Sequence, residues 1–96
     1  MARVLVAPAA ADDLARMIAT HSLPADTPGR VRRSIEPLGR FPRLGAPLAG
    51  RWRDYRFILG PWRWMVIVYA YDAGTDIVAI LTVQDGRTSV AAATAP

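Results

Sequence analysis

The feature that most constrains the fold is a change in hydrophobic period near residue 50. Before that point, apolar residues recur at intervals of three and four, which predicts helices over residues 8–20 and 27–36. Beyond it, β-branched and aromatic residues predict strands over residues 52–59, 62–71 and 77–84. Helices gathered in one half and strands in the other are typical of an α+β domain, here with two helices covering one face of a small, mostly antiparallel sheet.

Prolines and polar residues set the boundaries of these elements. Pro8 follows a short β-prone run over residues 3–6 and suits the first turn of a helix, where its missing N–H would be unpaired anyway. Thr27 offers a capping hydroxyl before the second helix, and Pro37 ends or kinks that helix. Residues 43–50 have no periodicity and predict a connecting loop. The expected order is β-α-α-β-β-β, with the first strand at a sheet edge.

Length and composition exclude several kinds of protein. The 96 residues, 52% of them hydrophobic, suffice for one folded domain, which we place at residues 1–89, with residues 90–96 as a flexible tail. Cysteine is absent and His21 is the single histidine, so we expect no disulfide, no metal site and no cofactor. Since no apolar run approaches the ~20 residues of a membrane helix and the start is a poor secretory signal, we expect a cytoplasmic protein without membrane contact.

The positive charge is concentrated in the middle of the chain. All twelve basic residues are arginines, and residues 29–63 hold nine of them against Glu36 and Asp54, a net charge of +7. Arginine stays charged at any working pH and matches phosphate or carboxylate with two parallel hydrogen bonds. The pattern therefore indicates an anionic partner, and a small arginine-rich nucleic-acid-binding module is one interpretation of the whole chain.

Several segments, in the right order, resemble the RelE/ParE superfamily of bacterial type II toxin-antitoxin toxins. The matching segments are residues 8–14 with Ile18, residues 35–38, the aromatic-Pro-x-x-Gly turn over residues 41–45, Tyr55-Arg56, Val68-Tyr69, and residues 83–87, where many members have Val-x-His-Gly-Arg. The resemblance implies a small cytoplasmic growth inhibitor that is neutralised by a cognate antitoxin. It also implies that operator DNA is contacted only through that antitoxin.

The superfamily contains two kinds of toxin, and the resemblance alone does not choose between them. ParE-like members poison DNA gyrase, whereas RelE-like members are metal-independent endoribonucleases that cut mRNA on the ribosome. For cleavage, Arg56 and Arg87 are the candidate catalytic cations, because a phosphate that gains charge needs cations around it. The chain departs from the ribonuclease pattern in having no lysine, in having Val66 where arginine is common, and in having Asp85 where histidine is common.

A second set of residues is predicted to contact the antitoxin or the target. Aromatic and basic residues alternate near two loops, as they do in proteins that stack on bases. The candidates are Arg51, Trp52, Arg53, Trp62, Arg63 and Asp85. Trp64 is expected to pack in the core, and His21 is expected to be structural.

Overall fold

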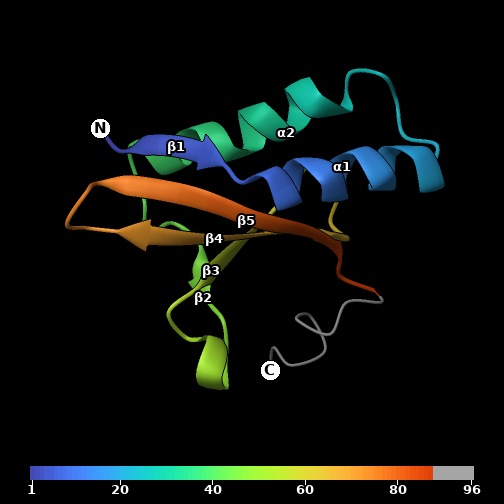
Figure 1. Ribbon diagram of the computed structural model, residues 1–96. Helices are drawn as coiled ribbons and strands as arrows, with labels where there is room; N and C mark the ends of the chain where they lie inside the picture. Colours follow the sequence, from blue (N-terminus) through green and yellow to red (C-terminus); the bar gives the residue numbers. More distant parts are fainter. Residues whose placement is uncertain (88–96) are drawn as a thin grey trace.

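The computed structural model describes residues 1–87 and has an α+β architecture, with two α-helices on one face of a five-stranded sheet (Figure 1). The elements in chain order are β1 (Arg3–Val6), α1 (Pro8–Thr20), α2 (Thr27–Ile35), the 3-10 helix η1 (Glu36–Gly39), β2 (Ala46–Pro47), the 3-10 helix η2 (Gly50–Trp52), β3 (Arg56–Leu59), β4 (Met65–Asp72) and β5 (Ile77–Asp85). The strand order is β1-β5-β4-β3-β2, with β1 parallel to β5 and the other pairs antiparallel. The expectation for residues 90–96 lies outside the described residues.

The bounds of the two helices follow the sequence pattern, but the prediction that Thr27 caps α2 was wrong. Thr27 is the first residue of α2, and its hydroxyl donates to the Pro24 carbonyl oxygen at 2.6 Å. α1 has Pro8 at its start, and α2 ends at Ile35, where Pro37 allows only the short 3-10 helix η1 to continue. Both helices lie on the same side of the sheet (Figure 1), as predicted. No helix within residues 1–87 is both long enough and apolar enough to cross a bilayer.

The prediction for residues 43–59 was wrong in two respects. The predicted loop contains a two-residue strand, β2, which pairs with Arg56 and Phe57 of β3. The strand predicted from residue 52 begins only at Arg56, because Gly50 has a φ of 63° and the N–H of Arg53 bonds back to the Gly50 carbonyl oxygen, at 3.2 Å. These contacts form η2, and the Leu48 N–H closes the loop on the Tyr55 carbonyl oxygen at 2.9 Å.

The central strand β4 is buried on both faces, as its continuous apolar sequence predicted. Ile67 and Tyr69 pack into the core under the helices, whereas Val66 and Val68 pack with Leu48 in a second cluster on the other face. The strand starts three residues later than predicted, because residues 62–64 form the turn between β3 and β4.

A hydrogen-bonded clamp holds the connection between η1 and β2. The N–H of Gly45 donates to the buried Tyr69 hydroxyl at 2.8 Å. The Arg56 guanidinium donates to the carbonyl oxygens of Gly45, at 2.8 Å, and of Arg43, at 3.3 Å. A Cβ atom on Gly45 would lie 2.5 Å from the Phe57 carbonyl oxygen, so only glycine fits here without a shift of the backbone. The clamp fixes the path of the chain immediately before β2.

Candidate functional site

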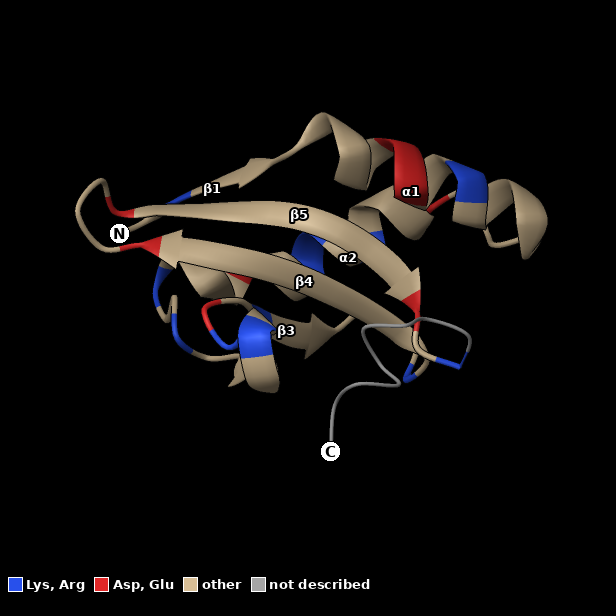
Figure 2. Cartoon of the chain, turned by 60° about the horizontal axis from the view of Figure 1, so that its bottom comes forward, with Lys and Arg blue, Asp and Glu red and all other residues tan. Residues whose placement is uncertain are grey.

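A groove of 720 Å³ runs from α1, past the end of β5, to the helix-free face of the sheet. Its floor is mainly apolar and aromatic, while polar side chains of α1 and β5 line one wall. The lining residues are Asp13, Arg16, Met17, Thr20, His21, Leu48, Trp52, Tyr55, Val68 and residues 81–85. Figure 2 shows that β4 and β5 carry charged residues only at their ends, so the strands under the groove present no cation between those ends.

The groove exists because β1 covers only part of β5. β1 pairs with residues Ile77–Ile80 of β5. The pairing ends at a hydrogen bond in which the Ala7 N–H donates to the Ile80 carbonyl oxygen at 2.9 Å. The chain then turns into α1, and among residues 1–87 no strand pairs with the outer edge of β5 beyond that point. An open edge of this kind can accept a strand from another protein.

Asp13 of α1 binds part of this open edge. Its carboxylate accepts hydrogen bonds from the Thr82 hydroxyl, at 2.6 Å, and from the Val83 N–H, at 3.3 Å. It also forms an ion pair with Arg16 at 3.5 Å. Asp13 lies beyond the first turn of α1, where its carboxylate faces β5.

Asp85 joins the end of α1 to the end of β5 beside the groove, in what we call the Asp85 clasp (His21, Asp85 and Arg87). The carboxylate accepts from His21 Nε2 at 3.0 Å and from Arg87 at 3.0 Å (Nε) and 2.8 Å (Nη2). The Arg87 guanidinium, followed by the His21 hydrogen bond, holds the pKa of Asp85 well below its ordinary value. Asp85 is therefore an ionised carboxylate that is satisfied internally.

The ring of His21 has a defined orientation in this clasp. Since the Asp85 carboxylate can only accept, Nε2 is the donor, and in the neutral ring Nδ1 accepts from the Thr20 hydroxyl at 2.9 Å. The ring stacks on Trp64, with centroids 5.0 Å apart and an interplanar angle of 12°. The expectation that His21 is structural agrees with these contacts, but the sequence did not show which residues it joins.

The tryptophans fall into two groups. Trp62 stacks on Trp64 at 5.9 Å, and the guanidiniums of Arg30 and Arg87 lie over the Trp62 and Trp64 rings, respectively. The ring of Trp62 therefore already has intramolecular partners. Trp52 also has ring partners, with the Arg51 guanidinium 5.1 Å and the Tyr55 ring 6.0 Å from its ring centroid, but it is 40% exposed and lines the groove.

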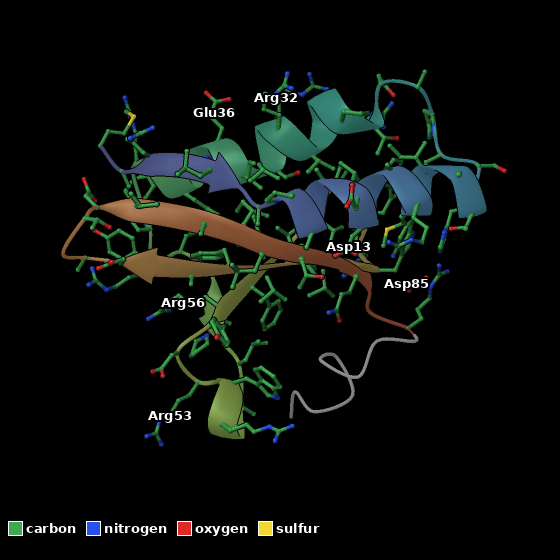
Figure 3. All side chains as sticks on the ribbon, viewed as in Figure 1. Asp13, Arg32, Glu36, Arg53, Arg56 and Asp85 are labelled. Atoms are coloured by element: carbon green, nitrogen blue, oxygen red, sulfur yellow. The ribbon has the colours of Figure 1, made fainter. Side chains whose placement is uncertain are left out.

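The structure does not bring Arg56 and Arg87, the two candidate catalytic cations, together. β4 separates β3 from β5, a lateral distance of about 10 Å. Arg56 is opposite Tyr69, and Asp85 is opposite Met65, about 13 Å further along β4. Figure 3 shows Asp85 near one end of the sheet and Arg56 toward the other. Arg56 belongs to the clamp at Gly45, and Arg87 belongs to the Asp85 clasp.

The remaining predicted contact residues are exposed. Arg53 follows η2 and points away from the sheet (Figure 3), and Arg63 lies on the turn between β3 and β4. Within the described part of the chain, no group of three or more His, Cys, Asp or Glu residues is placed to hold a metal ion.

Comparison with solved structures identifies the architecture. A chain of the RelBE2 toxin-antitoxin complex of Mycobacterium tuberculosis matches with a TM-score of 0.64 and 24% identity, over 88% of this chain and 96% of that one. This chain therefore has the fold of a chain found in that RelBE toxin-antitoxin complex. A chain of the intact RelBE complex of E. coli matches over the same shares with a TM-score of 0.64 and 13% identity. A conserved hypothetical protein of Helicobacter pylori matches with a TM-score of 0.61 and 13% identity, over 88% of this chain and 94% of that one. No protein-family model and no curated protein matches the chain.

Thus the RelE-type fold predicted from the ordered motifs is confirmed, whereas two parts of the site were not foreseen. Sequence reasoning missed the contact of Asp13 with Thr82, and it missed the joining of His21 to Asp85. Both pairs are more than sixty residues apart in the chain, so no local signal reports them. The unusual Asp85, at a position where the resemblance implied histidine, was the one available hint.

Proposed function

We propose that this protein is the toxin of a type II toxin-antitoxin module, which inhibits bacterial growth and is neutralised by a cognate antitoxin. The observation that carries the proposal is the RelE-type fold, shared over 88% of the chain with chains of two toxin-antitoxin complexes. The order of the sequence motifs supports it independently.

The groove is the proposed docking site of the antitoxin. Its apolar floor offers anchor positions, and the part of the β5 edge beyond Ile80, which no strand covers among residues 1–87, is the proposed place for an added strand. Arg51 and Arg53 lie beside it on and after η2 and would attract an acidic segment. Trp52, with its exposed ring in the groove, is the proposed aromatic anchor.

Of the two target classes, the geometry favours poisoning of DNA gyrase over cleavage of mRNA. RNA cleavage would require cations that converge on one phosphate. Arg56 is bonded to backbone carbonyl oxygens and Arg87 to a carboxylate, the two lie far apart, and the chain has no lysine to replace them.

Induced expression without a partner tests this function. We expect growth arrest with an early DNA-damage response, and purified protein should inhibit supercoiling by gyrase. Normal growth while folded, soluble protein accumulates would contradict the toxin proposal. If mRNA cleavage precedes DNA damage, the preference for gyrase is wrong; RNA binding without any growth effect would favour the nucleic-acid-binding module.

The exposed arginines beside the groove should control how fast the antitoxin binds. The double variant Arg51→Glu/Arg53→Glu is expected to slow association by about tenfold or more and to reduce its dependence on salt, because long-range attraction steers the encounter. Stopped-flow kinetics at several salt concentrations measure both. Arg32→Glu/Arg33→Glu on α2 is the matched control, with the same change in charge away from the groove, and an equal slowing there would place the interface elsewhere.

A further inference from the structure

A tight turn after η1 exposes two large apolar side chains. The N–H of Leu44 donates to the Phe41 carbonyl oxygen at 3.0 Å, and Pro42 takes the second position, where its fixed φ favours a turn. Phe41 is 60% exposed and Leu44 is 58% exposed. Packing of the hydrophobic core does not explain two apolar side chains that are this exposed on one turn.

This turn is held at both ends. Before it, the N–H groups of Arg40 and Phe41 both donate to the Pro37 carbonyl oxygen, at 3.1 and 2.9 Å. After it, the clamp fixes Gly45 through the buried Tyr69 hydroxyl and the Arg56 guanidinium. The backbone under the two apolar side chains is therefore pre-organised, which lowers the entropy cost of binding a partner.

The neighbouring surface is apolar and rimmed by positive charge. A shallow depression of 460 Å³ lies beside the turn, lined by Met1, Arg33, Glu36, Pro37, Arg40 and Phe41. Met1 is 87% exposed. In the depression, Arg33 and Arg40 outnumber Glu36, so its rim carries a net positive charge. The Arg43 guanidinium, by contrast, lies 5.0 Å from the centroid of the Tyr71 ring. Arg32 of α2 and Glu36 of η1 both point away from the sheet (Figure 3), so this side of the protein is open.

We propose that this region, the Phe41 surface (Met1, Arg33, Pro37, Arg40, Phe41 and Leu44), binds an acidic protein surface that has an apolar pocket. The inference rests on the proposed function, and it assigns this surface to the target of the toxin rather than to the antitoxin. None of its residues lines the groove, so the two surfaces are separate. The occupant is a protein rather than RNA because Phe41 is the single aromatic ring of this surface, whereas Met1, Pro37 and Leu44 are aliphatic and cannot stack on successive bases.

The double variant Phe41→Ala/Leu44→Ala tests the proposal in cells and in solution. Both side chains are exposed, so the thermal midpoint should change little, whereas binding of the target should weaken by roughly tenfold or more, as for anchor residues in general. We expect the double variant to lose growth arrest and to keep the wild-type affinity for the antitoxin. Leu5→Ala/Val6→Ala is the matched control, because it truncates two exposed apolar residues, 42% and 51% exposed, on β1.

The growth-arrest experiment distinguishes failure of the toxin function from failure of the Phe41 surface. If the wild-type protein causes no arrest, the toxin function fails, whereas arrest by both the wild-type protein and the double variant overturns the Phe41 surface alone. An equal loss of antitoxin affinity would also overturn it. If the double variant unfolds, the variant Arg40→Glu tests the Phe41 surface in its place. This variant reverses one exposed charge of the rim and should likewise relieve growth arrest.

Photo-crosslinking tests whether the partner is a protein or an RNA. A photo-reactive phenylalanine analogue replaces Phe41, and crosslinking is carried out in cells whose growth this variant has arrested. The crosslinked species should resist nuclease and be digested by protease. A nuclease-sensitive RNA adduct would overturn the assignment to a protein partner.

Discussion

Gly45→Ala is expected to lower the free energy of unfolding by about 3 kcal/mol, because the added methyl group would press on a buried, hydrogen-bonded region. The new Cβ atom would lie 2.5 Å from the Phe57 carbonyl oxygen and 2.8 Å from the ring and hydroxyl of Tyr69. The first contact is with backbone, so no side-chain rotation relieves it. Relief requires a shift of the chain that also weakens the hydrogen bond from the Gly45 N–H to Tyr69.

The same substitution at Gly29 provides the control. Gly29 lies within α2 and a Cβ atom there would meet nothing within 4 Å, so Gly29→Ala should raise stability by about 0.5–1 kcal/mol through helix propensity. Urea denaturation measures both variants. Two changes of the same sign and similar size would contradict the account of the clamp.

Gly45→Ala also connects stability with the proposed interaction surface. A displaced Gly45 releases one end of the turn that presents Phe41 and Leu44. Growth arrest should therefore weaken in this variant even at temperatures where it is mostly folded. Gly29→Ala, which leaves the turn untouched, should arrest growth like the wild-type protein.

The sequence predicts the elements whose determinants are local. The bounds of α1 follow from Pro8 and the apolar spacing, and the burial of β4 on both faces follows from its continuous apolar run. The edge position of β1 was also predicted correctly. The start of β3 was predicted wrongly. Aromatic residues near Trp52 have high strand propensity, but the positive φ of Gly50 and the hydrogen bonds of η2 turn this segment into a 3-10 helix.

The candidate site was predicted less well because its contacts are between distant residues. Arg56 was chosen for its charge and its place in a motif, and nothing local indicates that its guanidinium bonds to the carbonyl oxygens of Arg43 and Gly45. Similarly, Asp85 was chosen as an unusual residue, but its partner His21 comes from the end of α1. Strand register decides both cases, and register depends on the whole sheet.

The Asp85 clasp should make the protein sensitive to acid. Because the pKa of Asp85 in the folded protein lies below its ordinary value, its contribution to stability is fully present above about pH 5, beyond the unfolded-state pKa of roughly 4. That contribution is lost progressively as the pH falls toward the lower, folded-state pKa. Asp85→Asn removes the titrating group with little change in shape, so we expect it to be less stable than the wild-type protein at pH 7.

Urea denaturation of both proteins from pH 7 to pH 2 measures the effect. The difference in midpoint should be largest above pH 5 and should shrink below about pH 4, since the Asp85 carboxyl group of the unfolded wild-type chain then takes up a proton while that of the folded protein stays ionised. Near-ultraviolet circular dichroism should change as well, because loss of the clasp frees His21 and Arg87 from their positions on Trp64. Asp72→Asn is the matched control, since Asp72 is exposed and accepts the Gly74 N–H within its own turn. A constant difference between wild type and Asp85→Asn at every pH would mean that the clasp does not depend on the charge of Asp85, and His21 and Arg87 would then be held by their stacking on Trp64 alone.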